Sequence, residues 1–126
     1  MRDDLDRLRD IRQAIDRIFS RTSSGVVAFR QDEMLQVWVL HHLQIIGEAA
    51  RALSSGFLAR HPDKVWKQAT GMRNILVHHY FEIELDRVWN VVESDLPLLK
   101  RRVQGILASS AWVICMFAHL CAMMDS

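Results

Sequence analysis

The chain has 126 residues, which is the size of one domain and leaves little room for a second hydrophobic core. Half of the residues are apolar, 25% are charged, and there are only five Gly and two Pro, a composition that argues against a disordered or collagenous chain. With 16 Lys and Arg against 15 Asp and Glu, the formal charge is +1. Any nucleic-acid partner must therefore be bound by a local patch of the surface.

The termini and the cysteines indicate a cellular compartment. The first residues, Met1 to Asp4, lack the apolar stretch of a signal peptide, so we expect a cytoplasmic protein. Cys115 and Cys121 lie close together in one apolar stretch, without the spread-out spacing of a domain built on disulfides. We expect both to be buried, reduced thiols.

Hydrophobic periodicity predicts two helices in the first half of the chain. Apolar residues recur at helical intervals from Leu5 to Phe19, and the turn residues from Thr22 to Gly25 place the end of this helix near Ser20. Its Arg and Asp residues alternate, which is typical of a solvated face with paired charges. A second helix is expected over about 32–53, where apolar residues repeat at steps of three and four.

Two further helices are expected in the second half. Pro62, followed by Asp63, is favourable in a first helical turn, so a third helix begins near Pro62 and runs toward His79. A fourth begins at Phe81, and Pro97 predicts a break or kink late in it. No alternating strand pattern is flanked by hairpin turns. The sequence therefore predicts an all-α fold, an antiparallel bundle of four main helices.

The composition changes after Arg102, which divides a helical domain (1–102) from an apolar tail (103–126). The tail carries no charged side chain from Val103 to Met124, and its length is compatible with a membrane span of about 20 residues. However, Gln104 and His119 are among the residues that make it more polar. Three interpretations are open: a fifth helix packed on the bundle or in an oligomer, which we favour, a membrane anchor, or an altered C-terminus.

The densest cluster of chemically capable residues is Arg73-Asn74-Ile75-Leu76-Val77-His78-His79-Tyr80. A His that titrates near neutral pH can take a proton from a ribose 2′-hydroxyl, and a guanidinium can hold a phosphate through paired hydrogen bonds. Together, Arg73 and His78 suit metal-free RNA cleavage. Asn74 could set the tautomer of His78, and Tyr80 could stack on a base or donate to a phosphate. The commoner explanation of such an Arg and His is an ion-paired surface residue and a satisfied polar residue.

Helical geometry constrains how these residues can cooperate. At about 100° per residue, Asn74 and His78 share a face of an α-helix, whereas Arg73 and His78 diverge by roughly 140°. Cooperation of Arg73 with His78 therefore requires the long reach of the Arg side chain, a distorted helix end or a second subunit.

The cluster resembles the signature of HepT-like ribonuclease toxins of the HEPN superfamily, in which an Arg, four residues, a His, any residue and a Tyr follow one another. The pattern falls on Arg73, His78 and Tyr80. The resemblance extends over about 5–100. Other stretches that resemble the family are Ile45-Ile46-Gly47-Glu48-Ala49-Ala50, His61-Pro62-Asp63 with Trp66, Asp86-Arg87-Val88-Trp89, and Asp95-Leu96-Pro97.

The resemblance implies a helical homodimer in which two copies of the motif line one cleft and cut RNA, mRNA or tRNA, without a metal or other cofactor. Arg73 and His78 would be catalytic and Asn74 a supporting residue. Tyr80 would be the modification site of a type VII toxin–antitoxin system, where an MntA-like nucleotidyltransferase antitoxin transfers AMP to it. The added phosphate and adenosine would obstruct an RNA backbone.

Several neighbouring residues are not assigned to the catalytic site. His79 falls at the variable position of the signature, and an accessory polar role is favoured for it. Paired histidines such as His41 and His42 point about 100° apart on a helix, and no carboxylate-rich site is spaced to complete a metal site. Glu48 is a candidate buried acid facing the motif, although a solvated or ion-paired Glu is the commoner case.

A second hypothesis, from another functional class, is a non-catalytic HEPN scaffold that binds a nucleotidyltransferase or a nucleotide. It predicts a stable complex without RNA cleavage.

Overall fold

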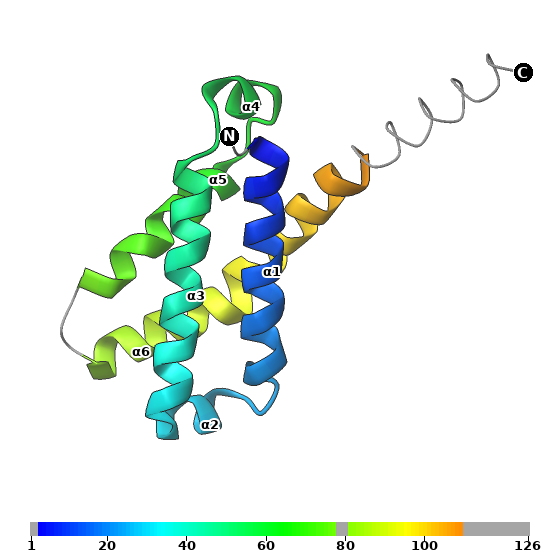
Figure 1. Ribbon diagram of the computed structural model, residues 1–126. Helices are drawn as coiled ribbons and strands as arrows, with labels where there is room; N and C mark the ends of the chain where they lie inside the picture. The colour runs from blue at the N-terminus through cyan, green and yellow to red at the C-terminus, as the bar shows by residue number, and fades with distance from the viewer. Residues whose placement is uncertain (1–2, 78–80, 110–126) are drawn as a thin grey trace, which may run out of the picture.

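The computed structural model describes residues 3–77 and 81–109, and within these ranges it is all-helical, without a β-strand. Helices α1 (Asp4–Thr22) and α3 (Glu33–Arg51) lie side by side and run in opposite directions (Figure 1). Helix α5 (Lys64–Gly71) packs on α3, and α6 (Phe81–Asn90) leads into a helical segment over 96–109. This arrangement confirms the predicted all-α fold, and α1, α3, α5 and α6 correspond to its four main helices.

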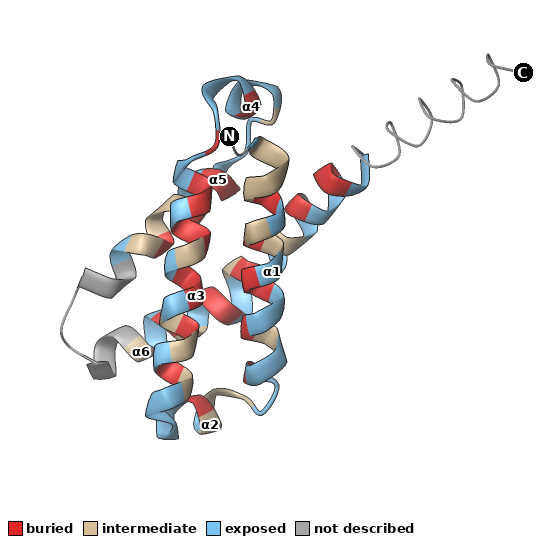
Figure 2. Cartoon of the chain, viewed as in Figure 1, coloured by how far each residue is buried: buried red, intermediate tan, exposed pale blue. Residues whose placement is uncertain are grey.

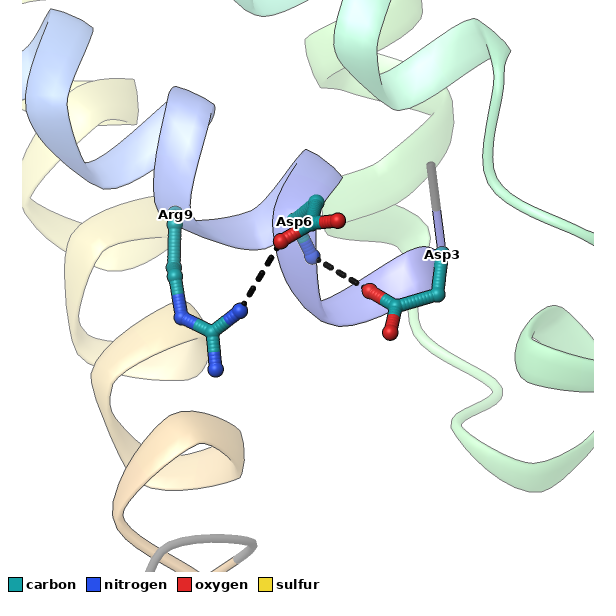
Figure 3. Close-up of polar contacts among 3 residues, drawn as sticks. All are labelled: Asp3, Asp6 and Arg9. Carbon is teal, nitrogen blue, oxygen red and sulfur yellow. Dashed lines mark hydrogen bonds and ion pairs between the residues drawn. The ribbon is translucent and has the colours of Figure 1, made fainter. Parts of the chain in front are cut away.

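Helix α1 shows how the amphipathic pattern becomes structure. Its N-cap is Asp3, whose carboxylate accepts a hydrogen bond of 2.8 Å from the backbone N–H of Asp6 (Figure 3). Asp6 in turn pairs with Arg9 at 3.0 Å, so the alternating charges pair on the exposed face. The opposite face of α1 is buried. Buried residues also recur along α3 and the segment 96–109 (Figure 2). The fully buried residues of α1 include Leu8, Ile11, Ile15 and Ile18.

Two short helices that the sequence did not predict lie in the connections. Helix α2 (Val26–Gln31) follows Gly25, whose positive φ of 91° is a conformation that favours glycine. Phe29 of α2 is buried and lies against Trp89, with ring centroids 5.4 Å apart. Asp32 ends α2 and caps α3 by accepting from the N–H of Leu35 at 3.1 Å. Helices this short give no periodic signal, because they contain fewer than two full turns.

Helix α4 (Ser55–Arg60) is joined to the start of α1. Asp4 accepts hydrogen bonds from the hydroxyl and the backbone N–H of Ser54, at 2.6 and 2.9 Å. These two bonds hold the pKa of the Asp4 carboxyl below its ordinary value, since they stabilise the charged form. Phe57 of α4 packs edge-on against Trp66, with ring centroids 5.3 Å apart. The second connection is thereby tied to both α1 and α5.

Helix α5 differs from the predicted third helix at both ends. Its N-cap is Asp63, which accepts from the N–H of Val65 at 3.1 Å, so Pro62 precedes the helix and does not occupy its first turn. The helix ends at Gly71 and tightens into a 3-10 helix, η1 (Met72–Val77), instead of continuing as an α-helix toward His79. Residues 78–80, including His78, His79 and Tyr80, lie outside the described residues.

The predicted irregularity near Pro97 takes the form of a π-helical turn, η2 (Val91–Asp95). The N–H of Leu96 reaches back five residues to the carbonyl of Val91, and the helix then continues through Pro97 to residue 109. A widened turn suits this place, because Pro97 has no N–H to donate and its ring would crowd the carbonyl four residues earlier in an α-helix.

Residues 103–109 continue this helix, and Val103, Ile106 and Leu107 are buried in the core. Lys100 of the same helical segment pairs with Asp16 of α1 at 2.7 Å. Residues 110–126, with Cys115 and Cys121, lie outside the described residues, so the three interpretations of the tail stay predictions. Among the helices of 3–77 and 81–109, none has the length and apolar character needed to cross a bilayer.

Helix α3 and η1 lie very close to each other at Gly47 of α3. A Cβ atom placed on Gly47 would lie 2.7 Å from the Cβ and 2.9 Å from the backbone nitrogen of Arg73 in η1. Real Cβ atoms do not come this close to other atoms, so only glycine allows η1 to lie directly on α3. Met72, at the start of η1, is 3% exposed and completes this contact with the core.

Substituting Gly47 with Ala therefore tests the packing of η1. We expect Gly47→Ala to lower the free energy of unfolding by about 1–3 kcal/mol, because the added methyl group overpacks the contact. Gly105→Ala is the matched control: it also lies in a helix, nothing lies within 4 Å of its Cβ position, and we expect it to stabilise the protein by about 0.5–1 kcal/mol. Urea denaturation measures both, and equal effects of the two substitutions would contradict the close packing.

Candidate functional site

The structure describes two of the four predicted site residues. Arg73 and Asn74 lie at the start of η1, where Arg73 is partly exposed and Asn74 is exposed. The geometry of His78 and Tyr80 is not part of the described residues, so their placement stays a prediction. The site is therefore built from Arg73 and from the α3 residues on which η1 packs.

Arg73 is held by an ion pair that connects η1 to α3. Its Nε lies 2.8 Å from Oε1 of Glu48, the residue that follows Gly47. The two side chains are 41% and 49% exposed, so the pair lies at the surface and is open to solvent. A guanidinium has five N–H donors, and the ion pair lies at the nitrogen that carries one of them, Nε. The other four N–H groups belong to the two terminal nitrogens.

The acidic residue noted in the sequence thus proves to be ion-paired. Glu48 is neither a buried acid nor an isolated solvated one, and its partner is the Arg of the motif. The signal was present in the stretch from Ile45 to Ala50, which resembles the family's second-helix signature. The sequence alone did not reveal that Gly47 and Glu48 contact the same residue, because that depends on how α3 meets η1.

The 3-10 conformation changes the geometry expected for the motif. The shared face of Asn74 and His78 was derived for an α-helix, but α-helical geometry ends at Gly71. From Met72 to Val77 the helix has about three residues per turn, so the α-helical angles do not apply within η1, and the direction of His78 stays a prediction. The motif therefore begins in a distorted helix end, which is one of the three conditions named for cooperation between Arg73 and His78.

A surface groove of about 340 Å³ lies on the α1 side of Glu48. Glu48 thus borders the groove and contacts Arg73 at the same time. The groove offers amide, imidazole and guanidinium groups that could hydrogen-bond to a nucleobase or sugar. Its lining residues come from α1 and α3: Arg7, Asp10, His41, Gln44, Ile45, Glu48 and Ala49.

The paired histidines of α3 have different environments. His42 is 2% exposed, and its Nδ1 lies 2.7 Å from the carbonyl oxygen of Trp38, so Nδ1–H donates, since a carbonyl only accepts. His41 is exposed and borders the groove. In the part of the chain that the structure describes, no three His, Cys, Asp or Glu side chains cluster as a metal site would require.

Comparisons with known proteins agree on one family. A family model described as "Ribonuclease HepT-like" matches residues 11–106. A candidate RNase of Methanocaldococcus jannaschii is 38% identical over 76 residues, which are 60% of this chain and 70% of that protein. A candidate ribonuclease HepT of Thermococcus cleftensis is 33% identical over 102 residues, 80% of this chain and 93% of that protein.

A third relative, a candidate RNase of Caldanaerobacter subterraneus subsp. tengcongensis, is 34% identical over 79 residues, which cover 63% of this chain and 70% of that protein. No solved structure shows significant similarity to the chain. The family match includes α3, η1 and the motif from Arg73 to Tyr80, together with most of the remaining helical domain. The chain belongs to the HepT-like ribonuclease family.

Proposed function

We propose that this protein is a metal-independent endoribonuclease that cleaves cellular RNA, mRNA or tRNA, with Arg73 and His78 as its catalytic residues. The observation that carries the proposal is the placement of Arg73: its guanidinium is partly exposed at the surface and anchored through Nε, with its outer donors unused by that contact. A group held in this way suits the binding of a phosphodiester. Family membership and the RNase names of the relatives support the choice of RNA.

The proposed reaction is an internal transfer of the phosphoryl group. His78, as a neutral imidazole, takes the proton of a ribose 2′-hydroxyl, and the 2′-oxygen attacks the adjacent phosphorus. The bond from phosphorus to the 5′-oxygen breaks, this oxygen takes a proton from water, and the imidazolium of His78 gives its proton to the hydroxide that remains. Arg73 binds the non-bridging oxygens and stabilises the charge that develops on them. The products are a 2′,3′-cyclic phosphate end and a 5′-hydroxyl end.

Two further features complete the proposed site. Asn74 acts as a supporting polar residue, because an amide next to the motif can hydrogen-bond to an imidazole and fix its tautomer. The protein acts as a homodimer in which the motifs of two subunits line one cleft. A second subunit would remove the angular constraint on Arg73 and His78, because the two groups acting on one phosphate could come from different chains.

Cleavage of total RNA in the presence of a chelator tests the proposal. Wild-type protein should produce fragments with cyclic phosphate ends, whereas Arg73→Ala and His78→Ala should each lower the rate at least about 100-fold, since each removes a main catalytic contribution. Circular dichroism establishes that both variants are folded. Fragment ends are identified by their resistance to ligation at the 3′ end until the cyclic phosphate is opened and the phosphate is removed.

Cleavage at the wild-type rate by folded His78→Ala protein would contradict the assignment of the motif. Absence of cleavage by folded wild-type protein, with stable binding to a nucleotidyltransferase in a pull-down, would favour the non-catalytic scaffold.

The proposal includes a means of silencing the enzyme. In a type VII toxin–antitoxin system, an MntA-like nucleotidyltransferase would transfer AMP from ATP to Tyr80. The phenol oxygen attacks the α-phosphorus, a phosphodiester bond forms, pyrophosphate leaves, and the phenol proton passes to solvent. Tyr80 is two residues from His78 in the sequence, so the added negative charge and bulk would lie beside the cleft and repel an RNA backbone.

Incubation with ATP and an MntA-like enzyme should therefore add 329 Da per AMP, about the mass of one nucleotide residue, to wild-type protein and abolish its RNase activity. Tyr80→Phe lacks the phenol oxygen and should keep its activity after the same treatment. Mass spectrometry and the RNA cleavage assay give the two readouts. Loss of activity in treated Tyr80→Phe would place the inhibitory modification elsewhere.

A further inference from the structure

We propose that Glu48 is a positioning residue that orients the guanidinium of Arg73 for the RNA phosphate, an inference that rests on the proposed function. The proposal is based on the ion pair between Glu48 and Arg73, in which Oε1 of Glu48 lies 2.8 Å from Nε of Arg73. Glu48 acts on the substrate through Arg73, so it is not itself a catalytic residue.

The atom that Glu48 contacts decides what Arg73 can do. A guanidinium is planar, and an ion pair at Nε restricts the orientation of that plane about the side-chain axis. One N–H of each terminal nitrogen points outward, at the outer edge of the group, beyond the end of the side chain. This outer edge presents the paired donors that match two oxygens of a phosphate. Glu48 therefore holds the inner edge of the group and leaves the outer edge available.

Both partners are attached to backbone that is already fixed by packing. Gly47 allows the backbone of Arg73 to lie directly on α3, and Glu48 is the next residue of that helix. The backbone atoms that carry the two side chains are therefore nearly fixed. Forming the ion pair then costs less conformational entropy than it would between two mobile segments.

The pair is unsuited to a mainly stabilising role. Both side chains are nearly half exposed, and solvent screens such pairs so strongly that their contribution to folding is small. Glu48 could instead compete with the phosphate for Arg73, since both are anions. Competition and positioning predict opposite effects of removing the carboxylate: RNA binding would improve in the first case, and turnover would fall in the second.

Steady-state kinetics with a short fluorogenic RNA separate these effects. We expect Glu48→Ala to lower kcat about tenfold or more and to change KM by less than about threefold, because misorientation mainly affects the transition state. Glu48→Gln keeps an oxygen that accepts from Nε and should stay within about threefold of the wild-type kcat. Glu48→Asp, one methylene shorter, should resemble Glu48→Ala.

The matched control is Asp16→Ala. Asp16 forms a comparable ion pair with Lys100 at 2.7 Å, is 50% exposed, and joins two helices away from η1. Asp16→Ala removes one negative charge, as Glu48→Ala does, and we expect it to keep the wild-type kcat. Thermal unfolding of all variants identifies any loss of folded protein. The proposal is overturned if folded Glu48→Ala keeps wild-type kcat, if Glu48→Gln is as impaired as Glu48→Ala, or if Glu48→Ala binds RNA more tightly with undiminished turnover.

A double-mutant cycle tests whether Glu48 acts through Arg73. Lys has no Nε in the guanidinium position, so the orienting contact is absent in Arg73→Lys. In that background we expect Glu48→Ala to cost less than about twofold in kcat, against about tenfold in the wild type. Equal losses in both backgrounds would show that Glu48 acts independently of Arg73. These outcomes differ from a failure of the proposed function, in which wild-type protein itself does not cleave RNA.

Discussion

The site depends on one close contact, that of η1 with α3 at Gly47. The absence of a side chain there brings the backbone of Arg73 onto the helix, and the next residue, Glu48, then reaches Nε of the same Arg. Two adjacent residues of α3 thus fix first the backbone and then the side chain of Arg73. The buried face of α3, with Val39, Leu43 and Ile46, anchors this pair of contacts to the core.

Much of the fold could be predicted because the long helices carry periodic signals. The apolar spacing of α1 and α3 was sufficient to predict both helices, and α6 lies within the predicted fourth helix. Helices α2 and α4 were missed, since six residues are too few to show a period. The π-helical turn before Pro97 was foreseen only as an irregularity, because several distortions can accommodate a proline.

For the candidate site, the sequence predicted the residues but not their conformation. The residues of the motif were recognisable from their order in the sequence, and Glu48 was noted as facing them. The conformation was not predictable, because the change from α-helix to 3-10 helix at Met72 accompanies contacts of η1 with α3, which lie far away in the sequence. The assumption of a continuous α-helix therefore gave the wrong helix type at Asn74, although the residue types were sufficient to suggest RNA chemistry.

The central claim is that Arg73 binds the RNA phosphate with its outer edge while Glu48 holds its inner edge. NMR of the arginine side chains, with a 2′-O-methyl RNA that lacks the attacking hydroxyl, tests it most directly. We expect the terminal N–H signals of Arg73 to shift on RNA binding, while its Nε–H signal keeps the features of the pair with Glu48. Unchanged Arg73 signals at saturating RNA would contradict the account.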